Sequence, residues 1–342
     1  MLESNASSAA PRAAKSTEQS TGVSVRQSPT QPSSSAPVTV VIPTHDRAER
    51  VLDAVGSVLG QTRPAAEIVI VDDGSTDGTE EHLRSELAAE LEAGRVRLIV
   101  QPNAGVSAAR NRGIELAGQR WIALLDSDDL WRPEKLEHQF ALIEEDERSG
   151  AEVTLVHCDE IWIRRGNQVL QGRKHEKAGG RIFRRCLPLC AISPSAAVLR
   201  RDVLLGLGGF DEALPACEDY DLWLRWTARH SVHFVDDELV IKHGGHGDQL
   251  SRRFPVMDRF RIRALSNLLR SGAVRHLGSE ERAAARSTLQ QKVEIVAQGA
   301  RRRGREAEAL ELERELELTL AALDATSAGH LERAAVGGGA DE

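Results

Sequence analysis

The sequence predicts an α/β fold with a mostly parallel, twisted sheet that is flanked by helices and followed by a helical extension. Four apolar, β-branched runs carry this prediction: "VTVVIP", "EIVIVDD", "RVRLIV" and "RWIALLD". Continuous apolar runs are typical of strands buried on both faces of a parallel sheet. Helical segments lie between them, at about 47–59, 77–92 and 106–117, and each begins near a Ser, Thr or Asp that can cap it. Alternating strands and helices indicate right-handed βαβ units.

The composition is that of a soluble globular protein. Of the 342 residues, 28% are charged and 41% are hydrophobic. The net charge of −8 argues against nucleic-acid binding, which usually needs a basic surface. No run approaches the roughly 18 apolar residues of a membrane span, and the N-terminus has no apolar signal segment. The four cysteines form no CxxC pair and are expected to be reduced, which predicts a cytoplasmic protein.

The chain divides into four predicted segments. Residues 1–37 contain ten serines, four prolines and no aromatic residue, a composition that predicts a disordered tail. The α/β domain is expected at 38–255, a helical extension at 256–328 and a flexible tail at 329–342. Two apolar stripes in the extension predict a helical hairpin packed on the main domain, and they leave self-association through these helices open. The stripes are Leu289, Val293 and Val296, and then Leu312, Leu316, Leu320 and Leu323, with Ser279 as the expected cap of the first helix and Gly299 and Gly304 around the break.

Polar residues follow three of the four predicted strands. They are Thr44 to Asp46 after the first strand, Asp72 to Gly74 after the second and Asp126 to Asp128 after the fourth. In open parallel sheets, ligands bind outside the carboxyl ends of the strands. The sequence therefore predicts a ligand site at this edge of the sheet.

Asp126 and Asp128 are the central pair of this predicted site. In extended geometry, residues two apart point the same way, so both carboxylates could address one ligand. Carboxylate oxygens suit Mg²⁺ or Mn²⁺, which bind them together with substrate phosphates. A solvated turn is the alternative, whereas an EF-hand is excluded because its required glycine would fall on Trp131. Asp129 is expected to orient the turn or to cap the helix that follows.

Six motifs occur in order between Val38 and Arg252: "VVIPTHDR", "VDDGSTDGT", "NAGVSAARNRGI", "LLDSDDLW", "GGFDE" and "CEDYDLWLRW". Together they resemble the family 2 glycosyltransferases, which have the GT-A fold. The resemblance implies an inverting enzyme that transfers a sugar from a nucleotide-diphosphate donor to an acceptor hydroxyl in polysaccharide or glycoconjugate synthesis. The donor would be a UDP-, GDP- or dTDP-sugar.

The resemblance also assigns roles on the donor side. It implies that Thr44 and Asp73 line the pocket of the nucleotide base. Asp126 would lie near the ribose and Asp128 would be the main ligand of the metal, as the DxD motif of the family. The segment "PNAGVSAARNRG" is a loop that enters a helix whose free backbone N–H groups suit an anion. Arg110 and Arg112 of this helix could face the diphosphate; two solvated arginines are the alternative.

On the acceptor side, the resemblance makes Asp219 the catalytic base and lets Glu218 shape the acceptor pocket. Acids are also common at helix N-termini because of the helix dipole, which is a purely structural explanation of this pair. His243 and His246 lie in "KHGGHGDQLSR", a segment that in the family is thought to close over the nucleotide. Either histidine could complete a metal site or meet a phosphate, or be structural.

Two other functions remain open from the sequence. A nucleotidyltransferase would also couple aspartates to a metal, but "PTHDRAER" lacks the glycine-rich loop expected after its first strand. A non-catalytic nucleotide-sugar or carbohydrate-binding protein would keep the fold without turnover, although the set of Asp126, Asp128 and Asp219 favours an enzyme. Peripheral association with a membrane is left open.

Overall fold

The computed structural model describes residues 35–245, 254 and 256–336, with side chains up to residue 325. The predicted tail at 1–37 lies almost wholly outside these residues, and His246 lies outside them as well.

The first half of the domain has the predicted alternation of strands and helices. Strand β1 pairs in parallel with β2 and β4, and β2 pairs in parallel with β3. Both faces of β1 are buried, because Val41 packs in one apolar cluster while Val40 and Ile42 pack in another. This burial explains the continuous apolar run. The elements are β1 (Ala36–Thr44), α1 (Ala48–Leu59), β2 (Ala65–Asp72), α2 (Thr79–Glu86), α3 (Ala88–Glu92), β3 (Val96–Val100), α4 (Val106–Leu116) and β4 (Trp121–Leu124).

The second half extends the same sheet with strands that the sequence analysis did not assign. The strand order is β3-β2-β1-β4-β8-β6-β9-β5, with β7 paired to β6. Strand β8 is antiparallel to both β4 and β6, whereas β9 is parallel to β6, so the parallel pattern is interrupted here. The elements are β5 (Leu130–Trp131), α5 (Lys135–Arg148), β6 (Leu155–Arg164), β7 (Asn167–Val169), η1 (Arg173–His175), α6 (Phe183–Cys186), η2 (Pro194–Ala196), β8 (Val198–Arg200), α7 (Arg201–Gly206), α8 (Glu218–Thr227) and β9 (His233–Gly244).

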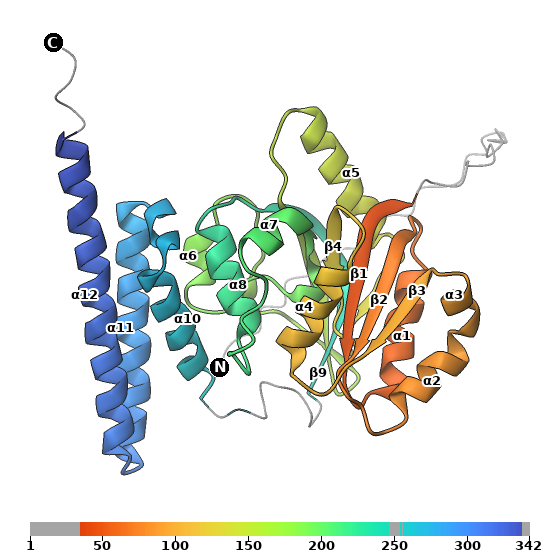
Figure 1. Cartoon of the computed structure of the whole chain (residues 1–342), viewed down its shortest axis with the longest axis horizontal. Helices are drawn as coiled ribbons and strands as arrows, with labels where there is room; N and C mark the ends of the chain where they lie inside the picture. Colours follow the sequence, from red (N-terminus) through yellow and green to blue (C-terminus); the bar gives the residue numbers. More distant parts are fainter. Residues whose placement is uncertain (1–34, 246–253, 255, 337–342) are drawn as a thin grey trace, which may run out of the picture. The chain divides into compact units, whose positions relative to one another are not determined.

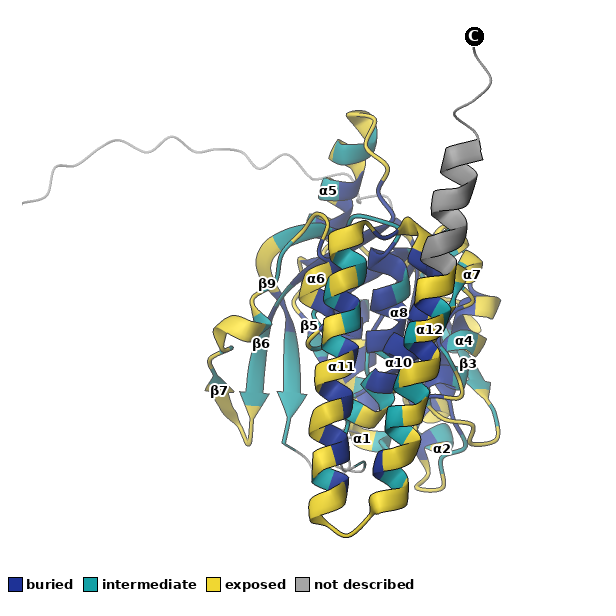
Figure 2. Cartoon of the chain, turned by 90° about the vertical axis from the view of Figure 1, so that its left-hand side faces the viewer, coloured by how far each residue is buried: buried dark blue, intermediate teal, exposed yellow. Residues whose placement is uncertain are grey.

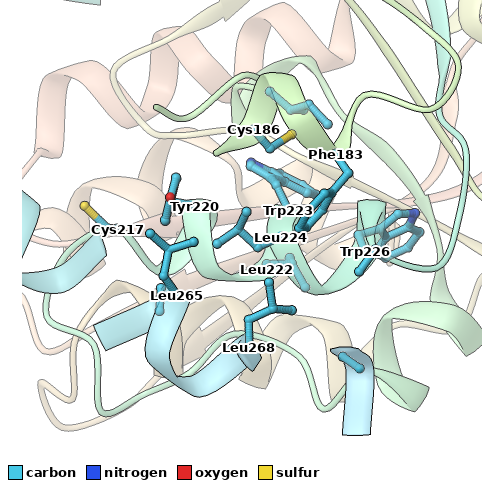
Figure 3. Close-up of a cluster of buried hydrophobic side chains, with 14 of the residues drawn as sticks. Phe183, Cys186, Cys217, Tyr220, Leu222, Trp223, Leu224, Trp226, Leu265 and Leu268 are labelled. Atoms are coloured by element: carbon cyan, nitrogen blue, oxygen red, sulfur yellow. The ribbon is translucent and has the colours of Figure 1, made fainter. Parts of the chain in front are cut away.

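Helix α8 holds the second half together. Its side chains Leu222, Trp223 and Trp226 are fully buried and share one apolar cluster with Leu265 and Leu268 of α10 (Figure 3). Leu222, Trp223 and Trp226 thus form the apolar face of this helix. Its first residues, by contrast, face the polar end of the sheet, as described below.

The C-terminal helices form the predicted hairpin, packed on the domain through α10 (Figure 1). Leu289, Val293 and Val296 are buried, and Figure 2 shows how buried and exposed residues alternate along α11. The expected cap is wrong: Ser279 is already the first helical residue, and Glu281 accepts the backbone N–H of Gly278 instead. Among the described residues, no helix is both long and apolar enough to cross a bilayer. The elements are α10 (Asp258–Arg270), η3 (Gly272–His276), α11 (Ser279–Arg302) and α12 (Glu306–Val336), which extends past the predicted boundary at residue 328.

Candidate active site

A cavity of about 810 Å³ opens at the carboxyl ends of β1, β2 and β4. Helix α8 closes it with its N-terminus, and β9 closes it with its last residues. The structure therefore brings together residues from segments that are far apart in the sequence. With the exception of Arg112, the described residues that the sequence analysis singled out for the site line this cavity: Thr44, Asp73, Arg110, Asp126, Asp128, Glu218, Asp219 and His243.

The end of β2 holds a loop in place beside the cavity. Asp73 accepts hydrogen bonds from the Gln101 side chain (2.8 Å) and from the backbone N–H groups of Ala104 (2.9 Å) and Gly105 (2.8 Å). A carboxylate offers about four acceptor positions, so these three bonds leave room for a further donor. Gly74 has a positive φ of 73°, and a Cβ there would lie 2.7 Å from the backbone nitrogen of Asn103, so this turn requires glycine.

Thr44 lies across from this loop at the end of β1. Thr44 lines the cavity, and its hydroxyl oxygen is buried and has no hydrogen-bond partner within the part of the chain that the structure describes. Buried polar atoms are nearly always paired, because an unsatisfied one costs about 1–3 kcal/mol. The Thr44 hydroxyl is thus available to a ligand at this end of the cavity.

The acidic segment after β4 is a turn. The N–H of Asp129 donates to the carbonyl of Asp126 at 3.0 Å, so the extended geometry expected for Asp126 and Asp128 is wrong. Both side chains nevertheless reach the cavity. The chain has to reverse here because β5, only a few residues later, pairs with β9.

Asp129 orients this turn from behind. Its carboxylate accepts from the Ser195 hydroxyl (2.7 Å) and from the backbone N–H of His243 (3.1 Å). It does not cap α5, which begins only at Lys135. Burial raises the pKa of Asp129 to about 8, partly offset by Lys242. Asp129 is therefore a structural acid that ties the turn to β9.

Arg110 joins two of the predicted site acids. Its guanidinium is 3% exposed and donates to Asp126 and to Glu218, both at 2.6 Å. Burial opposes its charge, but the two carboxylates raise the pKa of Arg110 above its usual value. Burial also disfavours ionised Asp126, yet Arg110 holds the pKa of Asp126 below its usual range. Arg112, the other predicted arginine, lies outside the cavity and pairs with Glu115.

The start of α8 places two carboxylates in different surroundings. Glu218 is 5% exposed and bonded to Arg110, and burial raises its pKa. Asp219 is half-buried, with one oxygen accepting the N–H of Tyr220 at 2.7 Å and the other accepting the Cys190 thiol at 3.0 Å. Burial, and then Asp219 itself, raise the pKa of Cys190 well above its usual value, which keeps the thiol protonated and donating. Glu218 therefore supports Arg110, whereas Asp219 faces the cavity.

The sequence analysis missed two residues that line the cavity, Arg47 and Lys242, and also Cys190, which contacts the cavity residue Asp219. Arg47 forms an ion pair with Asp128 at 2.9 Å, Lys242 donates to Ser193 at 2.7 Å, and Cys190 holds Asp219. Burial opposes the charge of Lys242, but nearby carboxylates, first among them Asp129, raise its pKa. Arg47 and Lys242 stand inside two quoted motifs and could have been noticed there, whereas nothing around Cys190 marked it.

Asp126 and Asp128 fit a divalent cation. Within the described residues, no three His, Cys, Asp or Glu side chains converge as a metal cluster. Mg²⁺ commonly uses only one or two carboxylates and takes its remaining ligands from phosphates and water, so two acids at the cavity wall suffice. His243 is close by, with its Nδ1 at 3.1 Å from the carbonyl oxygen of Asp128. The chemistry of this donor set is that of a hard cation bound together with a phosphate ligand.

Comparison with known families identifies the domain. The family model described as glycosyl transferase family 2 matches residues 39–207. The chain carries a family 2 glycosyltransferase domain. This match covers the four predicted strands and the acidic turn, whereas Glu218, Asp219 and His243 lie beyond it.

Relatives of this glycosyltransferase domain have consistent descriptions. An uncharacterized glycosyltransferase of Rickettsia conorii is 31% identical over 228 residues, covering 63% of this chain and 35% of that protein. The succinoglycan biosynthesis protein ExoO of Rhizobium meliloti is 38% identical over 125 residues, covering 36% of this chain and 34% of that protein. The chain thus spans about a third of the length of these relatives.

A solved structure supports the fold. The mannosyltransferase PcManGT of Pyrobaculum calidifontis, in complex with GDP-Man and Mn²⁺, is 19% identical to this chain and superposes with a TM-score of 0.53. The match covers 88% of this chain and 88% of that chain. At this identity the likeness speaks for the fold alone. The predicted GT-A type of fold, with C-terminal helices, is confirmed.

Proposed function

We propose that the protein transfers a sugar from a nucleotide-diphosphate donor to an acceptor hydroxyl with inversion, in the synthesis of a polysaccharide or glycoconjugate. One observation carries the proposal: a single cavity in a family 2 glycosyltransferase domain unites the acids after β4 with the acids at the start of α8. The description of ExoO supports the class of product. Four free cysteines accord with a cytoplasmic enzyme.

The end of the cavity near β1 and β2 would hold the nucleotide. The unpaired hydroxyl of Thr44 and the remaining acceptor position of Asp73 are suited to the edge of a base. Asp126 would lie near the ribose. Asp128 would be the main ligand of Mg²⁺ or Mn²⁺, which when bound would neutralise charge on the leaving diphosphate.

The residues around the diphosphate already supply positive charge. Arg47, Arg110 and Lys242 line the cavity, and the first two are paired with Asp128 and Asp126. Preorganised cations of this kind favour a transition state in which negative charge builds up on a leaving group. His243, whose ring nitrogen contacts the carbonyl of Asp128, would help to hold the acidic turn.

Asp219 would take the proton of the acceptor hydroxyl as the new glycosidic bond forms. Inversion follows from a direct attack on the anomeric carbon, opposite to the leaving diphosphate. Glu218 is the less suitable base because its carboxylate is buried and bonded to Arg110. The thiol of Cys190 would fix the orientation of Asp219.

The proposal is tested in two steps. First, nucleotide sugars are screened by thermal shift with Mg²⁺ or Mn²⁺, since a bound ligand raises the unfolding temperature. The selected donor is then incubated with the protein, and released nucleoside diphosphate is measured. Release that depends on metal supports a transferase, whereas binding without release would identify a binding protein and contradict the proposal.

A variant at the acidic turn sharpens the test. Asp128→Ala should weaken metal-dependent donor binding by about tenfold or more, since metal ligands and their supports typically contribute that much. Asp53→Ala, on the outer side of α1, is the matched control and should bind the donor normally. Unchanged metal-dependent affinity in Asp128→Ala would rule out its role as the main ligand.

A further inference from the structure

The hairpin of β6 and β7, together with η1, carries an unusual charge for this chain. Residues 164–175, called here the basic hairpin, contain four Arg or Lys residues and no acid, although the whole chain has a net charge of −8. Figure 2 shows β7 and its surroundings as largely exposed. None of the four forms an ion pair with another described residue. They are Arg164, Arg165, Arg173 and Lys174, all of them exposed.

Leu170 lies among these cations and is 95% exposed. The other exposed large apolar residues in the described chain range from 37% to 64%. Single exposed apolar side chains are common on soluble proteins. A leucine that is 95% exposed, in a segment with two cations on either side of it in the sequence, is a more specific combination, because it pairs an apolar anchor with a segment that attracts anions.

The basic hairpin is anchored to the domain. The ring of Trp162 contacts that of His175 in a tilted arrangement, with 4.8 Å between centroids, and the Arg164 guanidinium lies 5.7 Å from the Trp162 ring. The indole N–H of Trp162 donates to Glu160 at 2.8 Å, and Glu160 forms a buried ion pair with Lys177 at 3.1 Å. The cations are therefore presented by a fixed support.

This support is also next to the cavity. Trp162 and Ile163 of β6 pair in register with Lys242 and His243 of β9, and the latter two line the cavity. The basic hairpin therefore continues from a strand whose neighbour lines the cavity.

We propose that the basic hairpin docks the protein on an anionic lipid bilayer. The four cations would contact lipid headgroups and Leu170 would enter the interface between headgroups and acyl chains. Amphipathic surfaces bind membranes through this combination of charge and apolar contact. A soluble polyanion would satisfy the cations equally well, but it offers no apolar partner to Leu170. The proposal does not depend on the proposed glycosyl transfer.

The test measures co-flotation of the full chain with vesicles. Vesicles of phosphatidylcholine with phosphatidylglycerol should bind the protein, more weakly at high salt, whereas pure phosphatidylcholine should not. Each cation near an anionic bilayer contributes about a fivefold gain in affinity, so reversing Arg173 and Lys174 with Arg173→Glu and Lys174→Glu should weaken binding by at least about 25-fold. Leu170→Ser should weaken it by about tenfold.

Matched controls lie at the far end of the helical hairpin. Arg302→Glu with Arg303→Glu makes the same change in net charge, and Leu310→Ser removes a leucine that is 55% exposed. These variants should bind like the wild type. Thermal unfolding checks that every variant is folded. If the double variant with Arg173→Glu and Lys174→Glu is not folded, the double variant with Arg173→Gln and Lys174→Gln is used in its place.

Several results would overturn the proposal. They are equal binding to neutral vesicles, no binding to anionic vesicles, or an equal loss in the control variants. Loss of binding in the charge variants with full binding in Leu170→Ser, together with displacement by soluble polyphosphate, would instead identify an anionic polymer as the partner.

Discussion

The two sides of the cavity are built in different ways. On the β2 side, Asp73 binds a loop about 30 positions further along the chain, and every contact joins neighbouring βα units. On the α8 side, Arg110 reaches Glu218 across 108 positions and the N–H of His243 reaches Asp129 across 114. The first side needs only that parallel strands end at the same edge of the sheet. The second needs the whole domain to be folded.

The difference also concerns charge. The β2 side uses one carboxylate bonded to amide donors and one unpaired hydroxyl. The α8 side buries several charges together, among them Arg110, Asp126 and Glu218. Removing one member of a buried ion pair leaves its partner as an uncompensated buried charge, which strongly destabilises the folded state. We therefore expect changes on the α8 side to affect catalysis and stability strongly, and changes on the β2 side to affect mainly ligand binding.

Asp219→Asn should give the largest effect. Asn keeps the size of the side chain but cannot accept the proton, so turnover should fall by about 10²- to 10⁴-fold. Donor affinity should stay near that of the wild type because the β2 side is untouched. Release of nucleoside diphosphate and donor titration measure the two quantities, with Glu218→Gln compared in parallel. Full turnover in Asp219→Asn would place the base elsewhere.

Arg110→Met should cause the next largest effect, on stability. The change leaves the carboxylates of Asp126 and Glu218 without their cation, and removing one partner of a buried ion pair costs about 3–5 kcal/mol. Arg112→Met, on the exposed side of the same helix, should cost less than about 0.5 kcal/mol. Urea unfolding of both variants makes the comparison. Similar stabilities would mean that the cavity does not depend on the Arg110 bridge.

A change of similar size in the free energy of unfolding is expected when the pH is lowered, because of a buried histidine in β6. His157 is fully buried, and burial, followed by Lys177, lowers its pKa from 6.5 to about 4. Below pH 6.5 the unfolded chain therefore binds a proton that the folded chain does not, so stability falls as the pH drops from 6.5 towards 4. The loss amounts to about 3 kcal/mol, since one pKa unit corresponds to about 1.4 kcal/mol.

The variant His157→Gln should lose this part of the pH dependence, while His138→Gln, at an exposed histidine, should keep it. Chemical unfolding at several pH values gives the curves. An unchanged slope between pH 6.5 and 4 in His157→Gln would show that other groups cause the acid sensitivity.

Cys190→Ala should give the smallest effect. It removes the thiol that donates to Asp219, and a lost hydrogen bond of this kind costs about 0.5–1.5 kcal/mol, or up to about tenfold in turnover. Cys190→Ser keeps a donor and should restore most of the rate. Because the thiol orients the base, Cys190→Ala should also shift the pH profile of kcat while leaving donor affinity unchanged. Equal rates and profiles for both variants would exclude this positioning role.

Local patterns in the sequence determined the first half of the fold and most of the cavity wall. The strands before Thr44, Asp73 and Asp126 are apolar runs followed directly by polar residues, and parallel strands place their carboxyl ends together. Asp219, by contrast, was assigned through the family resemblance. Its place at the start of an amphipathic helix keeps it outside the core that the helix buries.

Tertiary structure alone decided how the charges are paired. The ion pairs of Arg110 with Asp126 and Glu218 were not predicted, and the paired acids after β4 lie in a turn where extended chain was expected. Local sequence patterns predict neither outcome. The partner of a buried charge comes from a segment that is distant in the sequence and lies next to the charge only in the folded domain. The same holds for Cys190 and Lys242. Each gains its role only when β9 and α8 close the cavity.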